Sequence, residues 1–424
     1  MNRRSLALAT AALVAATTAA SANDAPSAKR FDWTTRSAEA KQKLFELQQR
    51  IESFQFGADT VEAARRLVAA DPAFAMGEYY LSAVAAPPEN QEHLDKAVAL
   101  AKNASDGERR FIEAMVKVRA NQGQDFRDGI APLEKLAADY PDERLVQVIL
   151  GQLYQGANDA AKARDAFRRA DAIGPKSPRV RAFLANEDLL DGRYDEARRT
   201  FEDVASSLAK GAAPFAVRYG LAFADLYQGR PDDAIASLEK YVAEYKDSGA
   251  AQGFPEVFIW NSIARIQLEN GRLDAAMKAY EKGYESVPGS SLPDDQKQVW
   301  LGRLRHGRCR TLARMGRHDE AWKEAQSIKK MIDDGGEAAK QYLPAWHYLA
   351  GYLDLEKGDA KAAVEELKQA DATNPFHLLL LARAYEKTGQ KDDARTTYRA
   401  IVDSRQNGLE RALAYPEAKR KLGV

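Results

Sequence analysis

Six arginines fall within a short stretch around residue 310, and no acidic residue interrupts them. They are Arg303, Arg305, Arg308, Arg310, Arg314 and Arg317, and the nearest acids are Asp295 before them and Asp319 after them. A guanidinium group binds carboxylates and phosphates through a planar fork of N–H donors. The stretch therefore predicts an anion-binding surface if the arginines share one face. The alternative is a solvated helix face that neighbouring acids neutralise.

Local motifs of known catalytic or metal sites are absent from the sequence. It has no Gly-x-Ser-x-Gly, Gly-x-x-x-x-Gly-Lys or His-Glu-x-x-His motif. Of the five histidines, only His306 stands one helical turn from the single cysteine, Cys309, and two ligands do not make a metal site. We therefore expect no catalytic residue, no metal and no cofactor, although a triad assembled from distant segments would leave no local motif.

Paired carboxylates recur along the chain at the same distance after a glycine. The pairs are Asp195–Glu196, Asp232–Asp233, Asp319–Glu320 and Asp392–Asp393. A carboxylate in the first turn of a helix interacts favourably with the helix dipole and the free N–H groups. Because the pairs recur with a wider pattern, we interpret them as helix starts and not as catalytic dyads.

That wider pattern consists of small and large residues at fixed spacing. The fullest copy is a unit of about 34 residues that starts at Arg144. Its members are Leu150, Gly151, Tyr154, Ala163, Phe167, Ala170 and Pro175. Small residues let two helix backbones approach, large ones fill the space beside them, and the proline ends the second helix. Matching positions in later copies are Ala197, Ala234, Trp260, Ala264, Ala276, Tyr280, Ala363 and Ala394.

In order and spacing, these residues resemble the tetratricopeptide repeat (TPR), with its signature W-x2-L-G-x2-Y…A-x3-F…P. The resemblance implies an all-α fold, a right-handed α-solenoid of stacked helix hairpins, with about seven repeats in residues 142–402. We expect degenerate TPR-like helix pairs in residues 34–141 and a C-terminal capping helix in residues 403–424. The resemblance also implies that the first helix of each pair lines a concave groove.

Several polar and aromatic residues fall on this implied groove face. They are Asn261, Arg265, Arg303, His306, Arg310, Arg314, Tyr348, Tyr352 and Arg383. The spacings of three, four and four from Arg303 to Arg314 match one face of a helix. We therefore expect a basic, aromatic-edged groove that holds an acidic segment of a protein or peptide partner, with Arg303 and Arg310 outside the core.

The N-terminus has the parts of a secretory signal peptide, residues 1–22. Arg3 and Arg4 precede an apolar stretch, and Ala20-Ser21-Ala22 offers the small residues that signal peptidase requires. We expect cleavage between Ala22 and Asn23, a disordered leader at residues 23–33, and a mature chain in the periplasm or outside the cell. The apolar stretch is about 15 residues long, short of the roughly 20 that span a bilayer, and no later stretch is a transmembrane candidate.

Charge and cysteine content narrow the function further. The 62 basic and 62 acidic residues balance, which argues against a nucleic acid as partner. A single cysteine excludes an intrachain disulfide, so the fold depends on burial between repeats. The sequence thus predicts a non-catalytic protein-binding or scaffolding protein of the bacterial cell envelope. The alternatives are an assembly factor for envelope biogenesis or secretion, and an enzyme or enzyme subunit.

Overall fold

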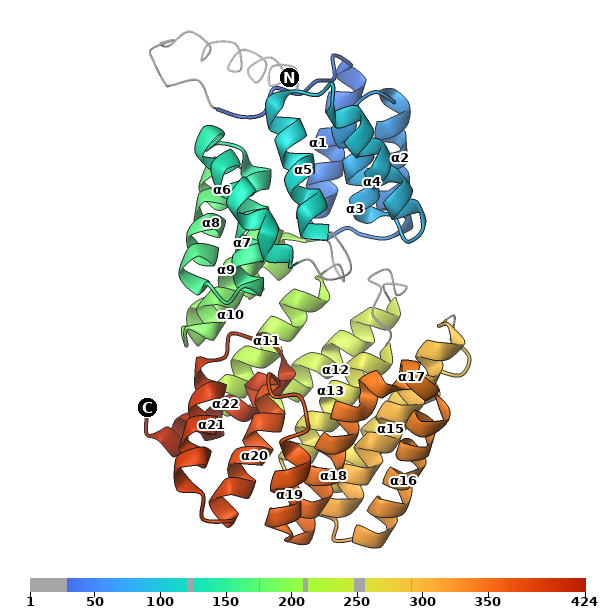
Figure 1. The fold of residues 1–424 in the computed structure, drawn as a ribbon, viewed down its shortest axis with the longest axis vertical. Coiled ribbons are helices and arrows are strands. Elements are labelled where there is room, and N and C mark those ends of the chain that lie inside the picture. Colours follow the sequence, from blue (N-terminus) through green and yellow to red (C-terminus); the bar gives the residue numbers. More distant parts are fainter. Residues whose placement is uncertain (1–28, 120–124, 175, 209–212, 248–255, 291) are drawn as a thin grey trace, which may run out of the picture.

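Helix hairpins stacked side by side make up the part of the chain that the structure describes (Figure 1). This computed structural model describes residues 29–119, 125–174, 176–208, 213–247, 256–290 and 292–424, and these residues contain no strand. The predicted all-α solenoid of helix hairpins is confirmed by the order of its helices. The predicted signal peptide, its predicted cleavage site at Ala22–Asn23 and Pro175 lie outside the described residues.

The first part of the chain forms three hairpins. Their helices are α1 (Ala38–Glu52), α2 (Ala58–Ala70), α3 (Ala75–Val84), α4 (Glu89–Ala101), α5 (Asp106–Arg119) and α6 (Ile130–Asp139), with the 3-10 turn η1 (Phe126–Gly129) before α6. α1 packs on α2, α3 on α4, and α5 on α6. These are the helix pairs expected to be degenerate repeats.

Seven further hairpins follow. Their first helices are α7 (Arg144–Gly156), α9 (Pro178–Leu190), α11 (Phe215–Tyr227), α13 (Glu256–Glu269), α15 (Asp294–Arg314), α18 (Leu343–Lys357) and α20 (Pro375–Lys387). Their second helices are α8 (Ala160–Ile173), α10 (Tyr194–Ser207), α12 (Pro231–Asp247), α14 (Leu273–Glu285), α16 (His318–Asp334), α19 (Ala360–Leu367) and α21 (Lys391–Asp403). The short α17 (Gly336–Ala339) and η2 (Lys340–Tyr342) precede α18, and α22 (Leu409–Leu422) ends the chain.

The hairpins form for the local reasons that the repeat pattern indicates. Gly192 has φ of 81°, a left-handed conformation that closes α9 without a Cβ clash. The paired acids lie in the first turns of α10, α12, α16 and α21. All the described residues of the predicted packing set are buried, from Leu150 in α7 to Ala394 in α21. A Cβ at residue 151 would overlap the Phe167 ring, so glycine there permits the contact between α7 and α8.

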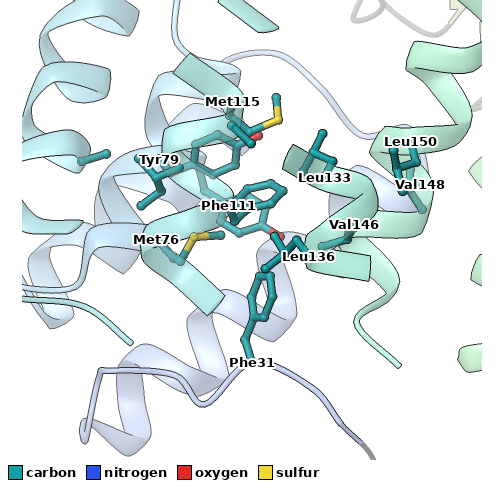
Figure 2. Packing of buried hydrophobic residues seen from close by; sticks show 14 of the residues in the cluster. Phe31, Met76, Tyr79, Phe111, Met115, Leu133, Leu136, Val146, Val148 and Leu150 are labelled. Atoms are coloured by element: carbon teal, nitrogen blue, oxygen red, sulfur yellow. The ribbon is translucent and has the colours of Figure 1, made fainter. Parts of the chain in front are cut away.

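An extended segment, residues 29–36, runs along the N-terminal hairpins, and we call it the N-terminal strap. Phe31 is 5% exposed and packs edge-on against Tyr140, with ring centroids 5.2 Å apart. Its ring also lies beside that of Phe111 (Figure 2). Its backbone N–H donates to a carboxylate oxygen of Glu143, and that of Thr34 donates to Glu108. The prediction of a disordered leader is therefore wrong for residues 29–33, because carboxylates and aromatic rings of later helices bind this segment.

The last helix does more than cover the final hairpin. α22 packs on α20 and α21, as expected of a capping helix, and it also contacts α11 and α13 from much earlier in the chain. Figure 1 shows α22 beside α20 and α11. The helix continues through Pro416. No helix within the described residues is long and apolar enough to cross a membrane.

Candidate partner-binding surface

Arg310 is a buried residue at the centre of the predicted groove set. It is 5% exposed, and its guanidinium donates to the hydroxyls of Tyr348 at 3.0 Å and Tyr280 at 3.1 Å. The His306 ring stacks on Tyr348, with centroids 5.2 Å apart. The structure thus brings Arg310, His306 and Tyr348 together. The expectation that Arg310 lies outside the core is wrong, because two tyrosines enclose it.

Acidic residues of the same chain pair with Arg265 and Arg314. Arg265 is 7% exposed, and its guanidinium lies 3.2 Å from a Glu410 oxygen and 3.3 Å from Glu269. Arg314 lies 3.5 Å from Glu269 and also donates to the Leu268 carbonyl. These guanidiniums are therefore neutralised within the molecule.

The remaining groove candidates also include paired, buried and exposed side chains. Arg383 forms a two-point ion pair with Glu417, at 2.9 and 2.5 Å. Asn261 bonds to a carbonyl of its own helix, and Tyr352 is 2% exposed. Arg303 is exposed and lies over the Trp300 ring, with no carboxylate within 4 Å among the described residues. Of the predicted arginines, Arg303 is the one that faces solvent without an ion pair in the described part of the chain.

Two imidazoles flank Tyr348, which stacks on His377 as well as on His306. Burial lowers the pKa of His377 to about 4, and burial together with nearby Arg310 lowers the pKa of His306 well below its usual value. Both rings are therefore neutral at pH 7. The described residues hold no group of three or more His, Cys, Asp or Glu side chains that could bind a metal ion.

The acids that neutralise this surface come largely from residues 404–424, which we call the C-terminal clasp. Glu410 and Glu417 both belong to α22 and stand two helical turns apart, so they share one helix face. The clasp also reaches α9: Arg405 donates to Glu187 and to Asp191, each at 2.6 Å. Sequence reasoning missed these acids, although their spacing of seven was visible.

A pocket of about 330 Å³ lies where α7, α9 and α11 meet the clasp. Its apolar lining residues are Phe183, Leu190, Phe215, Tyr219, Phe223, Ala160 and Ala216. Its polar lining residues are Gln155, Asn158, Asn186, Glu187, Arg405 and Asn407. Because Glu187 and Arg405 pair with each other, the pocket offers aromatic rings and side-chain amides. Such a lining buries an apolar side chain and hydrogen-bonds a peptide backbone. The sequence did not predict this pocket, since its walls come from distant segments.

The comparison with known protein families agrees with the repeat pattern in the sequence. Three family models described as tetratricopeptide repeat match the chain, one at residues 354–414, one at 114–178 and 219–291, and one at 178–203. Together these matches cover slightly more than half of the chain. A search among curated protein sequences gave no match.

Solved structures with a similar fold include other repeat proteins. A tetratricopeptide repeat protein from Parabacteroides merdae is 11% identical with a TM-score of 0.42, over 65% of this chain and 98% of that one. PilW, described as a type IV pilus biogenesis factor, is 17% identical with a TM-score of 0.37, over 68% and 97%. Human IFIT1, solved as a dimer with PPP-AAAA, is 16% identical with a TM-score of 0.44, over 85% and 88%. These likenesses concern the fold alone.

Proposed function

Because this chain belongs to the tetratricopeptide repeat family, whose fold is a scaffold for protein interactions, we propose that it is a non-catalytic scaffold of the bacterial cell envelope that binds a segment of a partner protein. The observation that carries the proposal is the pocket between α9, α11 and the C-terminal clasp. The N-terminal sequence, with its basic start and Ala20-Ser21-Ala22, supports export to the periplasm.

The pocket indicates how a partner segment binds. An apolar side chain of the partner enters between Phe183 and Phe223, while Asn186 and Asn407 bond to its backbone. An acidic residue of the same segment pairs with an arginine at the edge of this surface. The balanced charge of the chain supports a protein rather than a nucleic acid as partner.

A pocket-filling variant tests the proposal. Ala216 lines the pocket without being part of the core, so Ala216→Trp should occupy the pocket and leave the fold intact. Ala161→Trp, at an exposed site on α8, is the matched control. We expect the tagged mature chain and the control to capture the same protein from a periplasmic extract, and Ala216→Trp to lose it. Equal capture by Ala216→Trp would contradict the proposal.

The cellular location needs its own test. N-terminal sequencing of the exported protein should give a chain that begins at Asn23. A protein found only in the cytoplasmic fraction, with residues 1–22 retained, would contradict the proposed location in the cell envelope. It would not contradict the proposed binding of a partner.

A further inference from the structure

Arg179, in the first turn of α9, lies near two aromatic rings, one of which lines the pocket. Its guanidinium carbon is 5.6 Å from the centroid of Phe183 and 6.0 Å from that of Phe56. Phe183 lines the pocket, so Arg179 and the pocket share a wall. In the part of the chain that the structure describes, the Arg179 side chain makes no hydrogen bond and no ion pair.

The carboxylate whose negative charge acts on Arg179, that of Glu52, already has other partners. Glu52 accepts a hydrogen bond from Ser177 and lies 3.3 Å from the Arg144 guanidinium. Burial lowers the pKa of Arg179, and the negative charge of Glu52 only partly opposes this effect. A half-buried guanidinium has lost hydration, and here no acceptor within the described residues replaces the lost water. The site is therefore one that an added anion would stabilise.

A second arginine increases the positive charge of this surface. The guanidinium of Arg119, at the end of α5, lies 5.1 Å from the Tyr79 ring centroid and donates to Ser82 at 2.8 Å. The positive charges of Arg119 and Arg179 both oppose the rise in the pKa of Tyr79 that burial causes. Of Arg119, Arg144 and Arg179, only Arg144 has a carboxylate within 4 Å among the described residues.

We infer that Arg179 binds a carboxylate of the partner segment, and that the partner carries an acidic residue next to the apolar residue that enters the pocket. The inference rests on the proposed function and names the chemistry of the partner. The rings of Phe56 and Phe183 lie beside the guanidinium, whose N–H donors match a bidentate carboxylate. Arg119 adds a second positive charge to the same surface.

Selection from a phage-displayed library of random dodecapeptides tests this without knowledge of the natural partner. The full mature chain should select peptides with Asp or Glu adjacent to Phe, Leu, Trp or Tyr. Arg179→Gln should still select the apolar residue but lose the enrichment of acids. Arg181→Gln is the matched control, because Arg181 lies two residues along α9 and pairs with Asp203. It should behave like the parent chain.

The outcomes separate the inference from the proposed function. Equal acid enrichment by Arg179→Gln and the parent, or no acid enrichment by the parent, would overturn the role of Arg179. Peptides selected equally well by Ala216→Trp would instead overturn the pocket. For the best peptide, calorimetry should show binding about tenfold or more weaker with Arg179→Gln, and an unchanged melting temperature would show that the variant is folded.

Discussion

The side-chain amide of Asn407 donates to that of Asn186 at 2.7 Å, although 221 residues separate the two in sequence. Arg405 makes two further bonds to α9, to Glu187 and Asp191. In a linear solenoid each repeat contacts only its neighbours, and stability is close to a sum of local terms. Here the end of the chain is tied to its middle, so the hairpins between α9 and α21 form a closed unit.

Removal of Arg405 should destabilise this closed unit. Arg405→Gln leaves Glu187, whose side chain is 2% exposed, without its positive partner. Breaking such a buried pair should cost about 2–4 kcal/mol of unfolding free energy in a denaturant titration. Lys421→Gln, which removes an exposed pair with Glu386, is the control and should change stability by less than about 1 kcal/mol. Equal effects of the two changes would show that the clasp is not closed in solution.

Arg310 and Arg303 should differ in their contribution to stability. Arg310→Ala removes the hydrogen-bond donor of two buried hydroxyls, those of Tyr280 and Tyr348, and leaves a cavity. We expect a loss of about 2–4 kcal/mol. Arg303→Ala, at an exposed site, should lose less than about 1 kcal/mol. Thermal unfolding measures both, and an unchanged melting temperature of the Arg310 variant would place its side chain outside the core.

Two glycines of α15 provide a matched pair for the packing of helices. A Cβ at residue 307 would stand 2.6 Å from the Tyr280 ring, whereas a Cβ at residue 302 would meet nothing within 4 Å. Gly307→Ala should therefore destabilise by about 1–3 kcal/mol because of overpacking. Gly302→Ala should stabilise the fold by about 0.5–1 kcal/mol, because alanine lowers the conformational entropy of the unfolded chain. Effects of the same sign would contradict the contact between α14 and α15.

The N-terminal strap should contribute to the stability of the first hairpins. Phe31→Ala removes a ring that is 5% exposed and should cost about 3–5 kcal/mol. Phe45→Ala removes a ring that is 60% exposed and should stay within about 0.5 kcal/mol of the parent. Urea unfolding of the two variants makes the comparison. A strap that does not pack in solution would make the two results alike.

Acid should destabilise the fold through the two neutral imidazoles. The pKa of His377 is about 4, and that of His306 is well below 6.5, because both rings are buried near Arg310 and Arg265, while Glu410 partly offsets the effect at His377. Both histidines titrate near pH 6.5 in the unfolded chain, so between about pH 6.5 and 4 the unfolded state binds more protons. The free energy of unfolding should therefore fall as the pH falls through this window.

A double variant isolates this contribution from that of the carboxylates. With His306→Phe and His377→Phe, the rings still stack but cannot titrate. Denaturant titrations at pH 6.5 and 5 should show that the parent loses about 3 kcal/mol more than the double variant over this interval, about half of it from each histidine. Equal losses of unfolding free energy in the parent and the double variant would show that both imidazoles accept protons in the folded state as readily as in the unfolded chain.

The sequence predicts the hairpins well because the interactions that form them are local. Gly151 and Phe167 lie within one unit, and their sizes alone indicate the contact between α7 and α8. The arginine surface is harder to predict from the sequence, because Arg265 and its partner Glu410 are 145 residues apart. A repeat pattern indicates which face a residue occupies. It does not indicate that the end of the chain returns to that face.

The pocket and the strap escape sequence reasoning for a related reason. Phe183 and Asn407 line one pocket but belong to α9 and to the clasp, and each is ordinary in its own segment. Phe31 lies in a polar stretch before the first helix, and only the structure shows the rings of Phe111 and Tyr140 that surround it. Both features therefore depend on contacts between distant segments, which local periodicity does not indicate.

The C-terminal clasp also has a mechanical consequence. An open row of hairpins is elastic, because small rotations between neighbours add up along the row. The bonds from residues 405 and 407 to α9 join two distant points of that row, so its pitch cannot drift without breaking them. These bonds thus fix the spacing of the pocket walls before a partner binds. Partner binding therefore restricts fewer motions than it would in an open row of hairpins.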